Sequence, residues 1–212
     1  MTDSVWALDL VEDIEAPGWL FVPGDLDVEQ RNEWISTVLS ELVGKEGWSG
    51  EPIEREEALD VLMSALADRE EADSIAMFQV WPPLGGETAT CQIGVFPTAE
   101  MPDWVDSDAV VHRFDAPHIG PGIQCSTKRV ASIEDGPEVE LSGVHFVFKN
   151  EEITLVVSLI DSIELLTVNA LRGALALLGQ LRLIRSGDGR AFESVAFDGV
   201  LEESPWRFEA SA

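Results

Sequence analysis

The chain has 212 residues, of which 45% are hydrophobic and 25% charged, a composition typical of one large folded domain and not of a disordered or fibrous protein. A domain of this size buries roughly 70% of its unfolded surface, so it needs neither a disulfide nor a metal to fold. Forty acidic side chains against thirteen basic ones give a formal net charge of −27, which excludes nucleic acids and anionic membranes as direct partners.

Acidic side chains are concentrated toward the N-terminal end of the chain. Residues 1–75 hold twenty acidic and four basic side chains, a net charge of −16, whereas residues 76–212 hold twenty and nine. The first third is therefore the acidic pole of the molecule, and it also contains the two clearest amphipathic patterns.

The first elements are two short strands and a helix. Alternating residues predict strands at Val5–Leu10 and Trp19–Val22. Asp27 followed by Gln30 is the capping pattern of a helix start, and Gly44 is a left-handed stop at its end. The apolar residues of this helix share one face: Val28, Ile35, Val38, Leu39 and Leu42.

A second helix is expected to begin at Pro52, since proline is tolerated at the first helical position. Its apolar stripe is expected to be buried and consists of Leu59, Leu62, Met63 and Leu66, with Ala58 at the edge. With Leu59 at the centre of that stripe, 100° per residue places a row of mostly acidic residues outward: Glu54, Glu57, Asp60, Ser64 and Asp68.

From Ser74 the apolar period changes to two, which predicts a series of strands. They are expected at Ile75–Trp81, Thr88–Phe96, Ala109–Phe114, Ile123–Ser132, Val139–Lys149 and Ile153–Leu159. The turns Pro82–Glu87 and Lys149–Glu152 each connect two of them as a hairpin. A helix follows at Thr167–Ile184, and because it is apolar on nearly every side we expect it to be covered on most sides.

These elements predict one α+β domain over residues 1–184. Its antiparallel meander sheet is expected to be covered by two N-terminal helices and one buried C-terminal helix, in α/β/α layers. Residues 185–212 are expected to form a C-terminal extension with some mobility and a short strand at Ser194–Phe197.

The order of these elements resembles the Mog1/PsbP-like fold, in which an Ala/Pro-Gly-Trp opening precedes helices, a meander and a closing helix. Here the opening is Ala16-Pro17-Gly18-Trp19, and the closing part is Val144–Leu159 followed by Ala170–Leu183. The resemblance covers the element order of residues 16–184. Members of this family mostly serve as binding or assembly proteins, so the resemblance implies a non-catalytic role and assigns no site residue.

The N-terminus and the cysteines indicate a cytoplasmic protein. The first thirteen residues are acidic and lack the basic and apolar regions of a secretory signal. The apolar stretch Leu165–Ile184 contains two arginines, each of which costs about 2.5–3.5 kcal/mol near the centre of a membrane span. Cys91 and Cys125 have no CxxC spacing, and we expect both to be reduced.

Residues suited to catalysis or metal binding are few. The phosphate-binding glycine motifs and the G-x-S-x-G nucleophile motif are absent from the sequence. His112, Asp115 and His118 are weak candidates for a metal site, since alternation separates Asp115 from the two histidines and Pro117 ends the strand. Cys125 could meet one of the three histidines, His145 included, if their strands are neighbours. We expect no cofactor, no metal and no catalysis.

The tryptophans divide into two groups. Trp19 and Trp34 border apolar runs and are expected in the core. Trp48, Trp81, Trp104 and Trp206 stand beside turn residues, where a tryptophan either covers the edge of the core or anchors a partner.

Together, the acidic pole and the lack of catalytic motifs favour a non-catalytic protein-binding module: an adaptor, an assembly or secretion factor, or an immunity-type partner of a basic protein. Its partner is expected to present a basic surface to Glu54, Glu57, Asp60, Asp68, Trp48, Trp81 and Trp104. One alternative is a small-molecule-binding or metal-binding protein or enzyme with a pocket between sheet and helices. In another, the acidity is only an adaptation of the host and says nothing about function.

Overall fold

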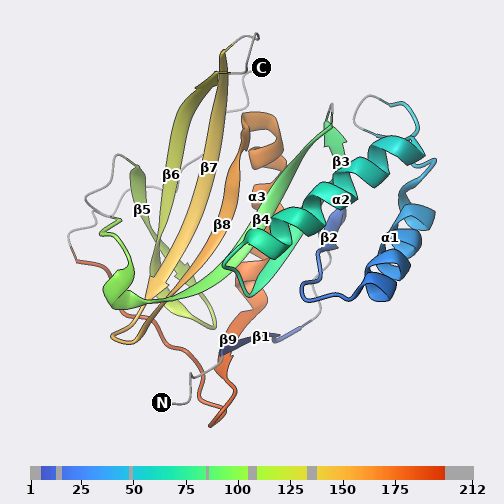
Figure 1. Cartoon of the computed structure of the whole chain (residues 1–212). Helices are drawn as coiled ribbons and strands as arrows, with labels where there is room; N and C mark the ends of the chain where they lie inside the picture. The colour runs from blue at the N-terminus through green and yellow to red at the C-terminus, as the bar shows by residue number, and fades with distance from the viewer. Residues whose placement is uncertain are drawn as a thin grey trace.

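The computed structural model describes residues 6–12, 16–47, 50–84, 86–104, 109–132 and 138–198. Three helices pack on an open antiparallel sheet (Figure 1), which confirms the expected α+β layers. The seven strands of this sheet follow in the order β2 (Trp19–Phe21), β3 (Ala76–Leu84), β4 (Glu87–Pro97), β8 (Ile153–Ile163), β7 (Glu138–Lys149), β6 (Gly120–Ser132) and β5 (Val110–Ala116). β1 (Trp6–Leu10) and β9 (Leu181–Arg185) form a separate two-stranded ribbon. The helices are α1 (Val28–Leu42), α2 (Arg55–Glu71) and α3 (Glu164–Gln180), and a 3-10 turn covers Thr98–Glu100.

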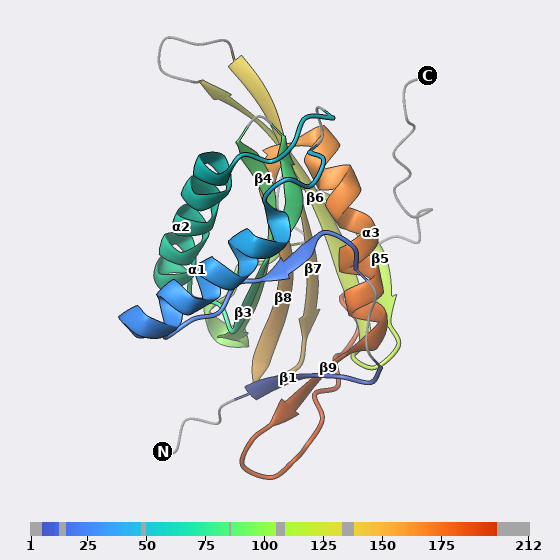
Figure 2. The ribbon, with the colours of Figure 1, turned by 90° about the vertical axis from the view of Figure 1, so that its right-hand side faces the viewer.

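The sheet has two faces, because residues aligned across antiparallel strands point to the same side. Cys91 aligns with Phe78 and Leu159, and all three belong to the core that includes α3. Met77 and Gln92 align in the next row, and Met77 packs with α1 and α2. We call these two sides the α3 face and the α2 face. Figure 2 shows α3 on one side of the sheet and α1 with α2 on the other.

The α3 face carries the larger core. α3 places Ala170 and Ala174 against the strands, both fully buried, and the small side chains let the helix approach the sheet closely. Around them lie buried residues of five elements and the ribbon, among them Phe146, Phe148, Leu155, Leu166, Leu177, Leu178, Leu183 and Phe192.

The α2 face is covered in two parts. α1 and α2 lie over β3 and β4, with Ile35, Leu39, Leu62 and Met77 in their core (Figure 1). Over the central strands no helix packs within the described residues, and a smaller cluster joins Met101, Trp104 and Phe197 to Ile123, Cys125, Val147 and Val156.

The expected start and stop of the first helix are confirmed. Asp27 accepts a hydrogen bond from the backbone N–H of Gln30 at 2.9 Å, and the Gln30 side chain accepts one from Asp27 at 3.0 Å. Gly44 has φ +81°, the left-handed conformation that ends a helix. Ile35, Val38 and Leu39 are buried, but Val28 is 76% exposed because it lies at the first helical position, beyond the contact with α2.

The second helix begins close to its predicted start, but its predicted buried face is wrong. α2 begins at Arg55, three residues after Pro52, which pairs with Glu46 in an isolated bridge. Leu62 and Leu66 are buried as expected, whereas Leu59 and Met63 are 37% and 45% exposed. The helix is rotated about its own axis by roughly a quarter turn relative to the predicted orientation. The buried positions are Ala58, Val61, Leu62, Ala65 and Leu66, and they belong to the core that α2 shares with α1 and β3.

The predicted hairpins are confirmed. β3 and β4 are longer than expected, so that a tight turn between Leu84 and Glu87 replaces the predicted long loop. β7 and β8 are joined at Asn150, whose side-chain oxygen accepts hydrogen bonds from the N–H groups of Glu152 and Ile153, each at 2.9 Å.

The end of the C-terminal helix differs from the prediction. The helix stops at Gln180, because Leu181–Arg185 pairs with β1 as β9. Leu165 and Leu175 are 51% and 40% exposed, so the expectation that most sides of this helix are covered is wrong: α3 is an outer layer with one buried face.

The described part of the expected extension, residues 185–198, packs on the domain. Phe192 is 1% exposed within the main core. Ser194 donates its hydroxyl to the carbonyl of Pro121 at 2.7 Å. The strand expected at Ser194–Phe197 consists of one bridge, between Val195 and Lys149.

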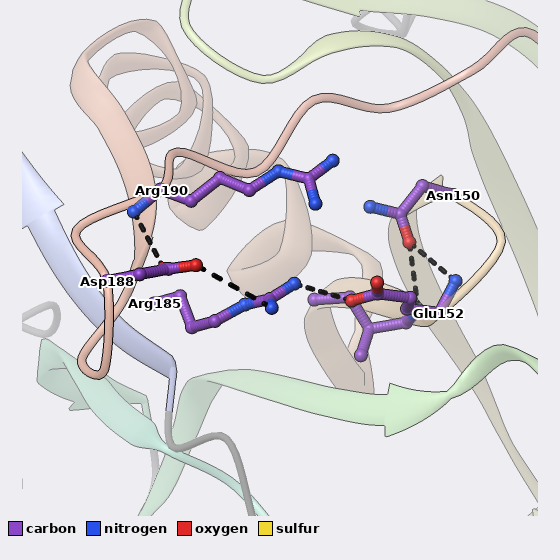
Figure 3. A network of polar contacts seen from close by, with 6 residues as sticks. Asn150, Glu152, Arg185, Asp188 and Arg190 are labelled. Atoms are coloured by element: carbon purple, nitrogen blue, oxygen red, sulfur yellow. Dashed lines mark hydrogen bonds and ion pairs between the residues drawn. The ribbon is translucent and has the colours of Figure 1, made fainter.

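A polar network joins β9 to the β7–β8 turn (Figure 3). Arg185 donates to Glu152 at 2.6 Å and lies 3.9 Å from the carboxylate of Asp188, while its guanidinium stands 5.1 Å from the centre of the Trp6 ring. The ribbon is therefore tied to the main sheet by charge as well as by apolar packing.

Among the described helices, none combines the length and the apolar content that crossing a membrane requires.

Candidate functional site

The outward side of α2 carries the carboxylates that the sequence places there. Glu54, Glu57, Asp60 and Asp68 are all exposed, and none of them forms an ion pair in the described part of the chain. The predicted acidic surface therefore exists, although the buried side of the helix differs from the prediction.

The exposed surface of α2 also carries two apolar residues that the sequence reasoning assigned to the core; at 100° per residue, Glu57 and Asp68 lie roughly 160° and 180° around the helix from the first of them, Leu59. Leu59 and Met63 are spaced by four residues, so they are neighbours on the helix surface. At 100° per residue, Glu56 and Asp60 flank them on the solvent side. We call the set formed by Glu54, Glu56, Glu57, Leu59, Asp60, Met63 and Asp68 the α2 surface.

α1 borders the α2 surface without neutralising it. Arg31 of α1 pairs with Glu70 near the end of α2, where both side chains are partly exposed. Arg69 donates to the carbonyl of Ser74 at 3.1 Å. These two cations are engaged at the C-terminal end of the helix, away from Leu59, whereas Arg55, exposed at the first position of the helix, lies four residues before Leu59.

The tryptophans do not join this surface. Trp81 is 5% exposed in the core between α2 and the sheet, where its ring N–H donates to Gln79 at 3.2 Å; its predicted role as a surface anchor is therefore wrong. Trp104 packs in the separate cluster of Phe197, with its ring centre 5.5 Å from that of His145. Trp48 and Trp206 lie outside the described residues.

The three weak metal candidates do not converge. His112 is 6% exposed on the α3 face of β5, Asp115 is exposed on the opposite face, and His118 is exposed in the turn that follows. Within the described residues, no group of three His, Cys, Asp or Glu side chains could hold a metal ion.

One cysteine does lie beside a histidine. Cys125 of β6 aligns directly with His145 of β7, and His145 Nδ1 is 2.9 Å from the hydroxyl of Ser158. Burial, however, raises the pKa of the Cys125 thiol to about 12, so the nucleophilic thiolate is not formed at neutral pH. Cys91 is on the other face with its pKa likewise raised to about 12 by burial, and both cysteines are free.

Sequence reasoning missed the polar row to which His145 belongs. Gln92, Ser158 and His145 align across β4, β8 and β7 on the α2 face, all half-buried. Their separation in sequence exceeds ten residues at each step, so only strand register could have revealed the row. The cavity beside it, between Trp104, Lys149 and Phe197, measures about 140 Å³, room for a few waters but not for a drug-sized ligand.

Comparison of the chain with protein-family models, with curated proteins and with solved structures returned no match. The Mog1/PsbP-like resemblance therefore rests on element order alone.

Proposed function

We propose that this protein is a non-catalytic binding protein that holds a basic protein partner on its α2 surface. The observation that carries the proposal is the exposure of Leu59 and Met63, at 37% and 45%, beside Glu56 and Asp60, two carboxylates that form no ion pair within the part of the chain that the structure describes. A partner that buries such a pair gains apolar contact as well as charge.

Charge and apolar surface have different roles in such a site. The exposed carboxylates raise the rate at which a basic protein arrives, and this effect weakens as salt screens it. The two apolar side chains become buried only in the complex, so they govern how long it lasts. An acidic surface that reflects host adaptation alone needs no exposed leucine or methionine in its middle, and this favours a partner over adaptation.

The chemistry of the remaining candidates supports a non-catalytic role. The raised pKa of Cys125 keeps its thiol protonated beside His145. The two free, buried cysteines also agree with the cytoplasmic location that we propose for the protein.

The test is the association of the protein with an amphipathic basic helix, acetyl-(Lys-Leu-Lys-Lys-Leu-Leu-Lys)₂-amide, measured by stopped-flow fluorescence at several salt concentrations. We expect Asp60→Lys with Asp68→Lys to slow association about tenfold at low salt, because both carboxylates lie outward. These positions are chosen because Glu54 and Glu57 stand at the start of α2, where the helix dipole favours a carboxylate.

The matched control is Glu100→Lys with Glu193→Lys, the same charge change at exposed carboxylates outside α2. Its on-rate should stay close to that of the unaltered protein. Equal slowing by both pairs of substitutions would mean that only net charge matters, and the proposed site would then be wrong.

A further inference from the structure

The ribbon leaves one edge of β1 without a partner strand. The backbone N–H of Val11 donates to the carbonyl of Gln180 at 2.9 Å. In an antiparallel pair every second residue bonds to the neighbouring strand, so Asp9 and Ala7 are the residues of β1 whose backbone bonds to β9. The N–H and C=O groups of Leu8 and Leu10 consequently point away from β9. Among the described residues, no other backbone group bonds to Leu8 or Leu10, so in this part of the chain a row of unsatisfied groups two residues apart lies open.

The other edge of the ribbon is occupied. Phe192 donates to the carbonyl of Leu183 at 2.8 Å, and Arg185 donates to that of Arg190 at 2.9 Å. These bonds run from β9 to the segment that follows it and confirm the alternation deduced for β1. Only the β1 side of the ribbon can therefore take up another strand.

An apolar cleft of about 620 Å³ lies along this free edge. All five residues of β1 line it. Side chains of a strand alternate between its faces, so a cleft that touches five consecutive residues follows the edge and not one face. We call it the β1 cleft; its other lining residues come from β2, β3, β4, α3 and β9: Phe21, Ile75, Ala76, Phe78, Ile93, Leu177 and Leu181.

Large apolar side chains remain exposed in the β1 cleft. Phe21 is 50% exposed, Leu10 39% and Ile75 37%. Phe21 stands 5.5 Å from the ring of Phe78, so the wall opposite β1 is aromatic. A monomeric protein rarely leaves such a contiguous apolar patch open unless it is an interaction site.

Exposed acidic residues lie next in sequence to the lining of the β1 cleft, and we call them its acidic rim. Glu12 is two residues after Leu10, and Asp73 is two residues before Ile75. Arg182, the nearest cation on the ribbon, is paired with Asp9. An occupant that carries positive charge beside its apolar side chains is therefore complementary to this rim, and an acidic one is not.

We infer that the β1 cleft binds an extended, basic segment of a partner protein, which adds to β1 as a third strand of the ribbon. The backbone of the segment bonds to Leu8 and Leu10, every second side chain enters the cleft, and the intervening cations face the acidic rim. Strand addition of this kind obtains affinity from the main chain and specificity from alternate side chains.

The free backbone row favours a peptide over a small apolar molecule as the occupant. A fatty acid could fill a cavity of this size. It would leave the N–H and C=O groups of Leu8 and Leu10 without partners, whereas a strand would satisfy them. The β1 cleft is formed by residues other than those of the α2 surface, so this proposal can be tested independently of the proposed function.

The experiment uses the full chain and a fluorescein-labelled peptide, Lys-Val-Lys-Val-Lys-Val-Lys. Binding is followed by fluorescence anisotropy, and amide hydrogen exchange is followed by NMR. We expect the amides of Leu8 and Leu10 to exchange at least tenfold more slowly with the peptide bound, while those of Ala7 and Asp9, already bonded to β9, change little. The same peptide N-methylated at every internal amide should bind at least tenfold more weakly.

Two substitutions at one position separate the backbone from the side chain. Leu10→Ala removes the side chain and keeps the N–H, and should weaken binding about threefold. Leu10→Pro removes the leucine side chain and the N–H together. The ribbon is retained, because the N–H of Leu10 is not bonded to β9, and peptide binding should weaken about tenfold. Phe21→Ala is a second test that leaves β1 untouched, with a loss of about tenfold expected. Leu59→Ser with Met63→Ser should leave this binding unchanged.

Three results would overturn the proposal. Equal binding of the N-methylated and unmodified peptides would mean that the main chain takes no part. Displacement of the peptide by decanoate, with no change in exchange at Leu8 and Leu10, would identify a small-molecule site. No binding at millimolar peptide would show that the edge does not accept a strand.

Discussion

α2 and α3 have the same length, seventeen residues, but they pack differently. α3 lies directly on β4, β7 and β8, whereas α2 packs chiefly against α1, with Met77 and Trp81 of β3 in their shared core. Each helix buries two alanines completely, Ala58 and Ala65 in α2 and Ala170 and Ala174 in α3, and leaves two large apolar residues outward. In both helices, therefore, residues of small volume hold part of the buried face.

The outward faces of the two helices differ in charge. α2 carries six acidic residues and α3 only one, Glu164. Leu165 and Leu175 of α3 are thus isolated apolar residues on a nearly uncharged surface, which is common in soluble proteins. Leu59 and Met63 are flanked by the carboxylates of Glu56 and Asp60, and this combination is the reason for proposing a binding surface on α2 and not on α3.

The largest expected effect is at the buried leucines. Leu62→Ala in α2 and Leu178→Ala in α3 should each lower the free energy of unfolding by about 2–5 kcal/mol, because both side chains are fully buried. Leu59→Ala and Leu175→Ala should each cost no more than about 1 kcal/mol. Urea unfolding measures all four, and equal losses at Leu59 and Leu62 would contradict the orientation of α2.

A smaller effect is expected from enlarging the alanines. Ala65→Leu and Ala174→Leu should each destabilise the protein by about 1–3 kcal/mol, since both alanines are fully buried and a larger side chain there overpacks the core. The controls Ala67→Leu and Ala176→Leu, on the exposed sides of the same helices, should lie within about 0.5 kcal/mol of the original stability. A stabilised Ala65→Leu would show that α2 is not in close contact there.

The helix starts should differ by a still smaller amount. Asp27→Ala should cost about 1 kcal/mol, because it removes the reciprocal cap of α1, whereas Asp27→Asn should retain most of it. Glu54 makes no side-chain cap at the start of α2, so Glu54→Ala should change stability by only a few tenths of a kcal/mol. Thermal unfolding of the three variants measures these differences. A large loss of stability for Glu54→Ala, without one for Asp27→Ala, would contradict the expected order of the two helix starts.

The smallest effect concerns charge on α2. Asp60→Lys should stabilise the protein by a few tenths of a kcal/mol at low salt, since Asp60 is three and four residues from Glu57 and Glu56. The gain should vanish in 1 M salt. On α3, Ala176→Lys places a second cation four residues after Arg172, so it should instead cost a few tenths of a kcal/mol at low salt, and that cost should also vanish in 1 M salt. Unfolding at two salt concentrations tests this, and a gain that persists at high salt would exclude repulsion as its cause.

Local signals in the sequence predicted local structure well. Asp27 with Gln30 identified the start of α1, Gly44 its end, and the turn at Asn150 one of the hairpins. Each of these features depends on residues within a few positions of one another, so it can be predicted from the sequence without knowledge of the fold.

Features that depend on distant residues were not predictable. Leu181–Arg185 continues an apolar helical pattern and becomes a strand only because β1, more than 170 residues earlier, pairs with it. The alanines of α2 gave a weak apolar signal compared with Leu59 and Met63, although they make the contact. As a result the exposure of Glu54, Glu57, Asp60 and Asp68 was predicted from the sequence, their role in binding stays a prediction, and the exposed apolar pair was found only in the structure.

The central claim, that Leu59 and Met63 make the α2 surface a binding site, is tested most directly by two matched double substitutions. The dissociation rate of acetyl-(Lys-Leu-Lys-Lys-Leu-Leu-Lys)₂-amide is measured for Leu59→Ser with Met63→Ser and for Leu165→Ser with Leu175→Ser. The first pair should raise the dissociation rate about tenfold or more, and the second should leave it unchanged. Equal rates for the two variants would contradict the account, because exposed apolar residues on either helix would then be equivalent.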